Sequence, residues 1–213
     1  MNTCYIACAL DCALDFTTDK TDLIIGADKG YFTLVKNGIE PDVVIGDFDS
    51  YTGEVKCNNI IRFPIKKDDT DSALAVKYAC ERGYKNIVVY GAIGGMLDHT
   101  MANVSLLGNY VNKDINIAFV DGDNILFGVK NNAIGFDKRA DGRISIFSFL
   151  ESAYNVNISG LLYEVENCTL TNDRALGVSN EFIGKKSKIS VENGILLVYT
   201  SKKNYDLYLT RRW

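Results

Sequence analysis

The first 112 residues alternate short apolar runs with stretches that carry a helical pattern. An apolar run of about 4–8 residues is typical of a strand, and the stretches between the runs have the length and periodicity of helices. Such alternation predicts βαβ units, whose strands lie parallel in one sheet. The predicted strands cover residues 4–9, 23–27, 43–46, 60–63 and 87–90, and the predicted helices cover about 30–37, 71–82 and 98–110.

The pattern changes after Ile115, where helical stretches give way to a series of strand-like runs. Gly, Asn and Asp turns separate them, and several alternate apolar and polar residues, which favours an antiparallel sandwich or barrel. We therefore predict an α/β N-terminal domain with a mainly parallel sheet over residues 1–118, and an all-β, sandwich-like C-terminal domain over residues 119–213. The runs are INIAFV, NILFGV, RISIFSF, YNVNISG, CTLTN, KISVEN and GILLVYT.

Composition excludes several classes of protein. Of 213 residues, 47% are hydrophobic and 23% charged, enough for a sizeable core. The formal charge of −4 shows no excess of Lys and Arg of the kind that binds nucleic acid. No run approaches the roughly 18 apolar residues of a membrane span, and Asp11 interrupts the apolar start of the chain, which argues against a signal peptide. We expect a cytoplasmic protein.

The six cysteines have no CxxC pair, and the single histidine, His99, cannot complete a zinc site with them. We interpret them as buried free thiols of a protein in a reducing compartment, without a chemical role.

Aspartates follow several of the predicted strands. Asp28 comes after LIIGA, and Asp47 and Asp49 come after VVIG, while Asp71 begins the second predicted helix. Ligands of an open α/β sheet bind at the carboxyl ends of the strands, so these side chains should converge there. Each carboxylate pair at about 4 Å would repel by about 1 kcal/mol in water and about 4 kcal/mol at a partly buried site. We predict that Mg²⁺ offsets this repulsion and brings nucleotide phosphates with it.

A helix cap or a turn is the alternative role for any one of these aspartates. Asp71 follows Asp68, Asp69 and Thr70 near a helix start, where capping explains it about as well as metal binding. Asp98, at the start of the next helix, has the same two interpretations. The recurrence of aspartate at several strand ends favours the shared site.

Gly94 and Gly95 lie between a strand and a helix, where backbone N–H groups can approach an anion at the positive end of the helix dipole. A tight turn explains the pair about as well. For His99 we favour a local hydrogen bond at the helix start over a role as general base, since a carboxylate or water can equally accept a proton.

The order of several segments resembles bacterial thiamine pyrophosphokinases along nearly the whole chain. GDFDS followed by the KDDTD segment is the most specific combination, whereas GAIGG or SNE alone carries little information. The matching segments are GADKG (26–30), PDVVIGDFDS (41–50), KKDDTDSALA (66–75), GAIGGMLDHTMANV (91–104), GLLYEVEN (160–167) and GVSNEF (177–182).

This resemblance implies transfer of a pyrophosphoryl group from MgATP to the hydroxyl of thiamine, giving thiamine diphosphate and AMP. It also implies a homodimer with substrate sites near the subunit junction and a β-rich domain that helps to bind thiamine. The implied residues are Asp47, Asp49 and Asp71 for Mg²⁺ and catalysis, Asp28 for the metal-nucleotide site, Gly94, Gly95 and Asp98 for ATP, and Ser179 and Asn180 for thiamine.

One position departs from the family pattern. Met96 stands where the family commonly has Arg in a GGRxDH-like segment, so a phosphate clamp is missing. Arg62, Lys66 or Lys67 are the candidates to replace it.

Two other functions compete with this one. DFD in GDFDS matches the DxD pattern with which some glycosyltransferases hold a metal and a sugar nucleotide, although KDDTD and GGMLDH argue against that class. A non-catalytic nucleotide or thiamine sensor, with Met96 as the mark of lost activity, is the other alternative.

Overall fold

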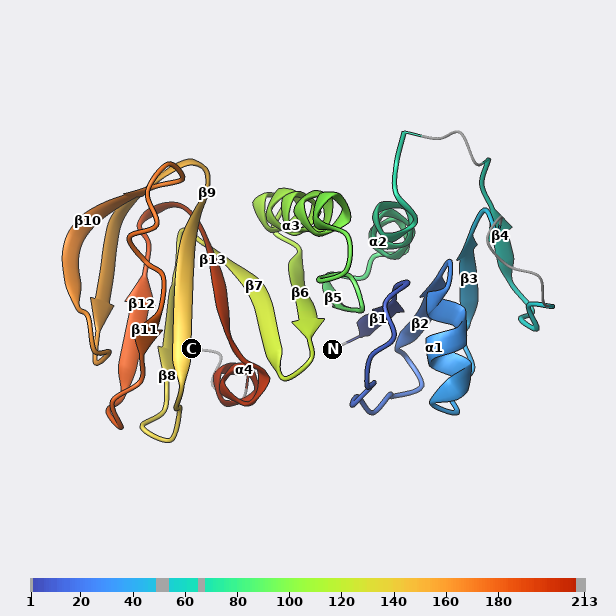
Figure 1. The fold of residues 1–213 in the computed structure, drawn as a ribbon, viewed down its shortest axis with the longest axis horizontal. Coiled ribbons are helices and arrows are strands. Elements are labelled where there is room, and N and C mark those ends of the chain that lie inside the picture. Colours follow the sequence, from blue (N-terminus) through green and yellow to red (C-terminus); the bar gives the residue numbers. More distant parts are fainter. Residues whose placement is uncertain (1, 49–53, 65–67, 210–213) are drawn as a thin grey trace. The chain divides into compact units, whose positions relative to one another are not determined.

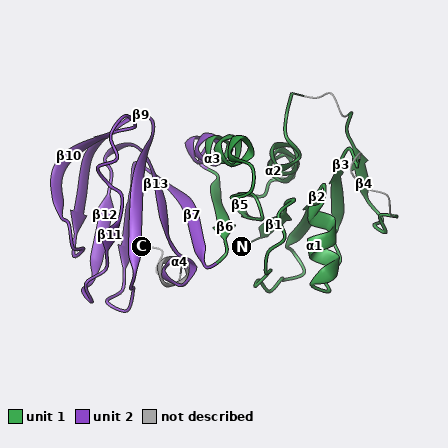
Figure 2. Ribbon diagram, viewed as in Figure 1, with its two compact units in different colours: residues 1–106, 115–122 green, residues 107–114, 123–213 purple. Residues whose placement is uncertain are grey.

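The computed structural model of the chain describes residues 2–48, 54–64 and 68–209. Two compact units make up the chain: unit 1 holds residues 1–106 and 115–122, and unit 2 holds residues 107–114 and 123–213 (Figure 2). The predicted boundary after residue 118 falls inside a strand that belongs entirely to unit 1, and the domain limits stay a prediction.

Unit 1 is built on a parallel sheet. Its strands are buried on both faces in large part, as parallel strands covered by helices are. The strands lie in the order β4-β3-β2-β1-β5-β6 and every neighbouring pair is parallel. They are β1 (Thr3–Ala7), β2 (Leu23–Ala27), β3 (Val43–Gly46), β4 (Ile60–Arg62), β5 (Asn86–Tyr90) and β6 (Asn116–Asp121).

Three helices accompany this sheet: α1 (Gly30–Lys36), α2 (Asp71–Glu81) and α3 (Leu97–Asn112). Figure 1 shows α1 on one side of the sheet and α2 and the first part of α3 on the other. The predicted strands and helices of this half are confirmed to within two residues at each end. Successive strands run outward from β1 to β4, and β5 then returns to the other side of β1, so a crevice opens where β1 and β5 end.

A glycine fixes how α1 begins. A Cβ atom on Gly30 would lie 1.8 Å from the carbonyl oxygen of Ala7, at the end of β1. Because only glycine permits this approach, α1 starts directly against β1, and the preceding residues are held at the carboxyl end of the sheet.

Unit 2 is antiparallel. Its longest strand, β9, pairs with β13 along its first half and with β10 and β12 along its second half. Leu150 and Asn155 have φ values of 70° and 51° where the strand changes direction. One strand thereby pairs with different neighbours in its two halves, and the sandwich-like form of the β-rich half stays a prediction. The strands are β7 (Asn124–Lys130), β8 (Ala133–Phe136), β9 (Arg143–Ser159), β10 (Val165–Thr171), β11 (Asn180–Glu181), β12 (Ser187–Ser190) and β13 (Asn193–Ser201).

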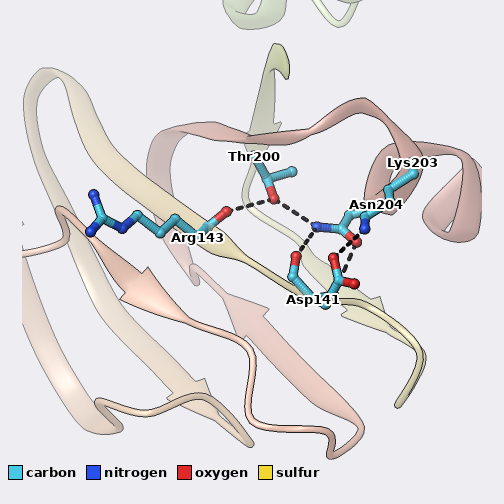
Figure 3. A network of polar contacts seen from close by, with 5 residues as sticks. All are labelled: Asp141, Arg143, Thr200, Lys203 and Asn204. Atoms are coloured by element: carbon cyan, nitrogen blue, oxygen red, sulfur yellow. Dashed lines mark hydrogen bonds and ion pairs between the residues drawn. The ribbon is translucent and has the colours of Figure 1, made fainter. Parts of the chain in front are cut away.

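A short helix that the sequence pattern does not predict, α4 (Lys202–Leu209), follows β13. Figure 3 shows how Asn204 joins it to the start of β9. The Asn204 amide nitrogen donates to the Asp141 carbonyl at 2.9 Å and to the Thr200 hydroxyl at 3.0 Å, and its oxygen accepts the Asp141 N–H at 3.3 Å. Lys203 pairs with the Asp141 carboxylate, and the Thr200 hydroxyl donates to the Arg143 carbonyl at 3.0 Å. These polar contacts, together with the buried Tyr205 that packs against Phe127, hold the start of α4.

All six cysteines are free thiols, as predicted, but only Cys4 and Cys8 are buried. Burial, with smaller contributions from Cys12 and Asp71, raises the pKa of Cys8 to about 12. This thiol is therefore unreactive at neutral pH. No helix in the described part of the chain is long and apolar enough to cross a membrane.

Candidate functional site

A pocket of about 550 Å³ lies within unit 1 at the crevice between β1 and β5. Its volume is in the range of small-molecule sites. Loops from the ends of three strands and the starts of two helices form its walls, as expected at a switch point of a parallel sheet. The lining residues are Cys8, Ala9, Leu10, Ala27, Asp28, Lys29, Asp69, Thr70, Asp71, Ser72, Gly91, Ala92, Gly94, Gly95, Met96, His99 and Asn103.

Asp28 occupies the tight turn between β2 and α1. Its φ of 49° is unusual for a residue other than glycine, and its N–H donates to the Ile45 carbonyl at 2.7 Å, which holds the turn against β3. Burial raises the pKa of its carboxyl group; the charges of Asp71 and Asp47 raise it further, and a hydrogen bond from the Lys29 N–H opposes them. The three carboxylates are thus close enough to interact.

Asp71 is the first residue of α2, but Thr70 is the residue that caps this helix. The Thr70 hydroxyl accepts the Ala73 N–H at 3.2 Å. Thr70 thus fills the N-cap position, and the Asp71 side chain lines the pocket.

The other predicted metal ligands are placed less completely. Asp47 follows β3 and is partly exposed, and it does not line the pocket. Asp49 lies outside the described residues, as do Lys66 and Lys67. Among residues 2–48, 54–64 and 68–209, no three His, Cys, Asp or Glu side chains come close enough together to hold a metal ion by themselves. The predicted ligand set remains a prediction.

The loop after β5 forms another wall of the pocket. A Cβ atom on Gly91 would lie 2.4 Å from the Leu10 carbonyl oxygen, so this position requires glycine. Gly94 and Gly95 have φ values of 96° and 64° and both face the pocket. However, the Gly94 N–H already donates to the Thr100 hydroxyl at 3.1 Å. The Gly94 N–H is therefore already occupied in this structure.

Near the start of α3, three residues singled out in the sequence differ in whether they line the pocket. Asp98 is exposed and does not line the pocket, and its carboxylate accepts the His99 N–H at 2.9 Å. This contact fits the capping interpretation. His99 and Met96 do line the pocket, and the Met96 side chain is 64% exposed.

Ser179 and Asn180 belong to unit 2. Ser179 has a φ of 59° and its N–H donates to the Ser145 hydroxyl at 3.0 Å. Asn180 is only 6% exposed, and its amide is hydrogen-bonded to the backbone of Tyr163. Asn180 therefore orders the local chain, and a role toward thiamine stays a prediction.

Several pocket residues were not predicted as site residues from sequence. Leu10, Lys29, Ser72 and Asn103 all line the pocket. Ser72 and Asn103 are buried polar residues inside helices, and a polar residue on an otherwise apolar helix face is the signal that points to them. Leu10 and Lys29 carry no comparable signal.

Comparison with family models identifies both halves of the chain. Residues 15–119 match the model for "Thiamin pyrophosphokinase, catalytic domain". Residues 131–196 match the model for "Thiamin pyrophosphokinase, vitamin B1 binding domain". The pocket lies in the region covered by the first model, whereas Ser179 and Asn180 lie in the second.

Individual proteins give the same result. The chain is 32% identical over 191 residues to thiamine pyrophosphokinase of Bacillus subtilis, covering 86% of this chain and 89% of that protein. It is 28% identical over 152 residues to thiamin pyrophosphokinase 1 of Caenorhabditis elegans, covering 66% and 62% of the two chains.

Among solved structures, the Bacillus subtilis thiamine pyrophosphokinase superposes with a TM-score of 0.83 at 30% identity, covering 94% of this chain and 99% of that one. The Geobacillus thermodenitrificans thiamin pyrophosphokinase superposes with a TM-score of 0.80 at 27% identity, covering 94% and 97%.

Proposed function

The chain belongs to the thiamine pyrophosphokinase family, and from this premise we propose how its residues carry out the reaction. The chain is an ATP-dependent thiamine diphosphokinase that makes thiamine diphosphate from thiamine. In our proposal the primary hydroxyl of thiamine attacks the β-phosphorus of ATP in line, the bond from that phosphorus to the bridging oxygen breaks, AMP leaves with this oxygen, and the hydroxyl proton passes to solvent. The enzyme mainly positions the two substrates and stabilises the charge that develops on the phosphoryl oxygens.

The observation that carries this proposal is the two-sided pocket at the end of β1 and β5. Asp28 follows β2 and Gly95 lies in the loop after β5, on either side of β1 in the strand order, and both line the pocket together with Asp71 at the start of α2. A triphosphate fits such a site because backbone N–H groups can meet its oxygens on one side, while a hard cation can bridge oxygens and carboxylates on the other.

The donor set fits Mg²⁺. Carboxylate oxygens are its preferred protein ligands, and Mg²⁺ commonly takes only one or two of them together with water and phosphate oxygens. Burial, and then the charges of Asp71 and Asp47, raise the pKa of Asp28, which means that its ionised form is unfavourable at this position. A bound cation would stabilise the ionised carboxylate. When bound, the ion would neutralise charge on the transferred group. We propose Asp47, Asp49 and Asp71 as its ligands, with Asp28 in support.

On the nucleotide side, we propose that the Gly95 N–H and the Lys29 ammonium group contact phosphate oxygens. Both residues line the pocket, and Lys29 adjoins Asp28. Gly94 shapes the loop, since its N–H is bonded to Thr100. A contact from Asp98 to ATP, which the family resemblance implies, could use the carboxylate oxygen that does not accept the His99 N–H.

On the acceptor side, we propose that the segment around Ser179 and Asn180 forms part of the thiamine site. Short polar side chains and backbone groups can hydrogen-bond an aminopyrimidine edge. Asn180 would act by holding Tyr163, because its own amide is occupied.

We propose that the enzyme is a homodimer through unit 2. A group of large apolar side chains, each at least 40% exposed, lies on the segments that flank Ser179, and such a group marks an interaction surface. A family-type dimer would cover it. The group consists of Phe147, Leu162, Tyr163, Leu176, Val178 and Ile183.

The six free thiols are consistent with the cytoplasmic location that we propose.

One assay separates this function from its competitors. We expect AMP to form from ATP only when thiamine is present, in equal amount with thiamine diphosphate. A sugar-nucleotide transferase would form no AMP from these substrates, and a sensor would bind them without turnover. The comparisons with known proteins favour neither alternative. Absence of thiamine-dependent AMP at saturating Mg²⁺ would refute the proposal.

A further inference from the structure

A row of short hydrogen bonds joins the start of α2 to the loop after β5. The Ser72 hydroxyl donates to the Asn103 side-chain oxygen at 2.7 Å, and the Asn103 amide nitrogen donates to the Ala92 carbonyl at 2.7 Å. On the other side, the Ser72 and Thr70 hydroxyl oxygens are 2.9 Å apart. Both Ser72 and Asn103 are buried, and α3 supplies the central residue of the row.

The direction of each hydrogen bond follows from the chemistry of its groups. A carbonyl oxygen only accepts, so the Asn103 nitrogen must face Ala92 and its oxygen must face Ser72. Ser72 has a single hydroxyl proton, which it gives to Asn103, so Thr70 must donate to Ser72. The Thr70 oxygen remains free to accept the Ala73 N–H at 3.2 Å. Every group in the row is satisfied, and none is charged.

A second residue of α3 holds the same loop farther along. The Thr100 hydroxyl accepts the Gly94 N–H at 3.1 Å and lies 2.9 Å from the Gly94 carbonyl and 3.2 Å from the Met96 carbonyl, either of which can take its proton. Thr100 and Asn103 are three residues apart and face the same way on a helix. The loop is therefore fixed to α3 at Ala92 and at Gly94, while Ser72 connects α3 to α2.

We propose that Ser72 and Asn103 are positioning residues that couple the two sides of the pocket. Asp71 precedes Ser72 directly, and Gly95 is in the loop that Asn103 and Thr100 hold. A rigid link between them would keep the carboxylate and the phosphate-binding backbone at a fixed separation, which in-line transfer requires. The catalytic part of this inference rests on the proposed function, whereas the mechanical coupling does not.

The test compares amide hydrogen exchange in the ligand-free, full-length protein and in variants. Ser72→Ala removes only one hydroxyl, so the fold should persist. We expect exchange in residues 91–96 to rise about tenfold, although the substitution is in α2, because the loop loses its link to that helix. Val76→Ala is the matched control: Val76 is a buried α2 residue outside the row, and its truncation should increase exchange in α2 but not in residues 91–96.

Kinetics supply the second measurement. Ser72→Ala and Asn103→Ala should each lower kcat about tenfold, with the KM for thiamine changed less than about twofold. The double variant should resemble Asn103→Ala alone, since Ser72 acts through Asn103. Val76→Ala should lower the melting temperature while leaving kcat near that of the wild type, which separates positioning from a general loss of stability.

Two results would overturn the inference: unchanged exchange in residues 91–96 of Ser72→Ala, or a kcat for Ser72→Ala equal to that of Val76→Ala. A wild-type protein that forms no AMP would instead overturn the proposed function. The exchange comparison needs neither substrate nor metal, so it would still decide whether α2 and the loop are coupled.

Discussion

The side-chain amide of Asn180 hydrogen-bonds both backbone polar groups of Tyr163. Its oxygen accepts the Tyr163 N–H at 3.0 Å, and its nitrogen donates to the Tyr163 carbonyl at 2.7 Å. The same oxygen also accepts the Glu181 N–H at 2.9 Å. Asn180 is 6% exposed, whereas Tyr163 is 64% exposed, so a buried amide holds an exposed aromatic residue in place.

Asn180→Ala should therefore lower stability and weaken thiamine binding together. Leaving the two Tyr163 groups without their partner costs about 1–3 kcal/mol, or about 3–10 °C in melting temperature for a chain of this size. The KM for thiamine should rise while the KM for ATP stays nearly constant. Asn193→Ala, an exposed position in the same unit, is the control and should change neither quantity. Equal effects on both substrates would remove Asn180 from the acceptor side.

Asp71→Asn should abolish turnover and leave the fold intact, because it removes a ligand charge but keeps the shape of the side chain. We expect kcat to fall by more than about 100-fold, or about 2.7 kcal/mol of transition-state stabilisation. Asp123→Asn, at an exposed turn of unit 2, controls for loss of one negative charge. Near-normal rates for Asp71→Asn in saturating Mg²⁺ would exclude this carboxylate as a ligand.

Asp28 predicts a pH dependence of stability. Burial and then the charges of Asp71 and Asp47 raise the pKa of its carboxyl group in the folded state. The protonated form is therefore favoured by folding, and this stabilisation is complete below the unfolded pKa of about 3.9 and is lost as pH rises through the folded pKa. Asp28→Asn, which cannot ionise, should melt at a higher temperature than the wild type at pH 8 without Mg²⁺.

The difference between Asp28→Asn and the wild type should disappear as the pH falls toward the unfolded pKa, since both side chains are then neutral. Thermal melts in the presence of a chelator, at a series of pH values, measure it. Glu40→Gln changes an exposed carboxylate of the same unit and should follow the wild-type curve. A constant offset of Asp28→Asn at every pH would mean that ionisation of Asp28 is not the cause.

Met96→Arg should be tolerated and should tighten ATP binding modestly. Met96 lines the pocket and is 64% exposed, so a guanidinium group can reach phosphate oxygens without displacing buried atoms. Met101→Arg is a matched control on α3, because Met101 is 63% exposed but does not line the pocket. Equilibrium binding at low and high salt should show a gain for Met96→Arg that weakens with salt. A loss of affinity would mean that the site is adapted to methionine.

Hydrophobic pattern was sufficient to predict most of unit 1. The strands over residues 23–27 and 43–46 agree with β2 and β3 at both ends, because a parallel strand buried on two faces is an uninterrupted apolar run. The same argument could not assign β6. The run INIAFV resembles in composition the strand-like runs that follow it, yet it pairs in parallel with β5. Only the tertiary structure decides which sheet such a strand joins.

The sequence pattern predicted that several residues near strand ends lie together, but it gave no sign of the buried polar groups inside helices, and the roles of the site residues stay a prediction. Asp28, Asp71, Gly94 and Gly95 line one pocket because strand ends converge. The sequence gives no reason to distinguish Ser72 from any other residue in the first turn of a helix. Its hydrogen-bond partner, Asn103, is 31 positions away in the sequence. The helix α4 was missed for a similar reason, since Asn204 is buried by contacts that no local periodicity reveals.

The place of β13 in unit 2 determines when this unit can fold during synthesis. β13 pairs with β7 along one side and with β9 along the other, so the earlier strands remain unpaired at that position until Asn193–Ser201 has left the ribosome. The six parallel strands of unit 1, in contrast, all lie before residue 122. At about 5–20 residues per second, the parallel sheet can form seconds before β13 is available. The nascent β-rich half therefore exposes strand edges late in translation, and chaperones that bind such edges should engage it there.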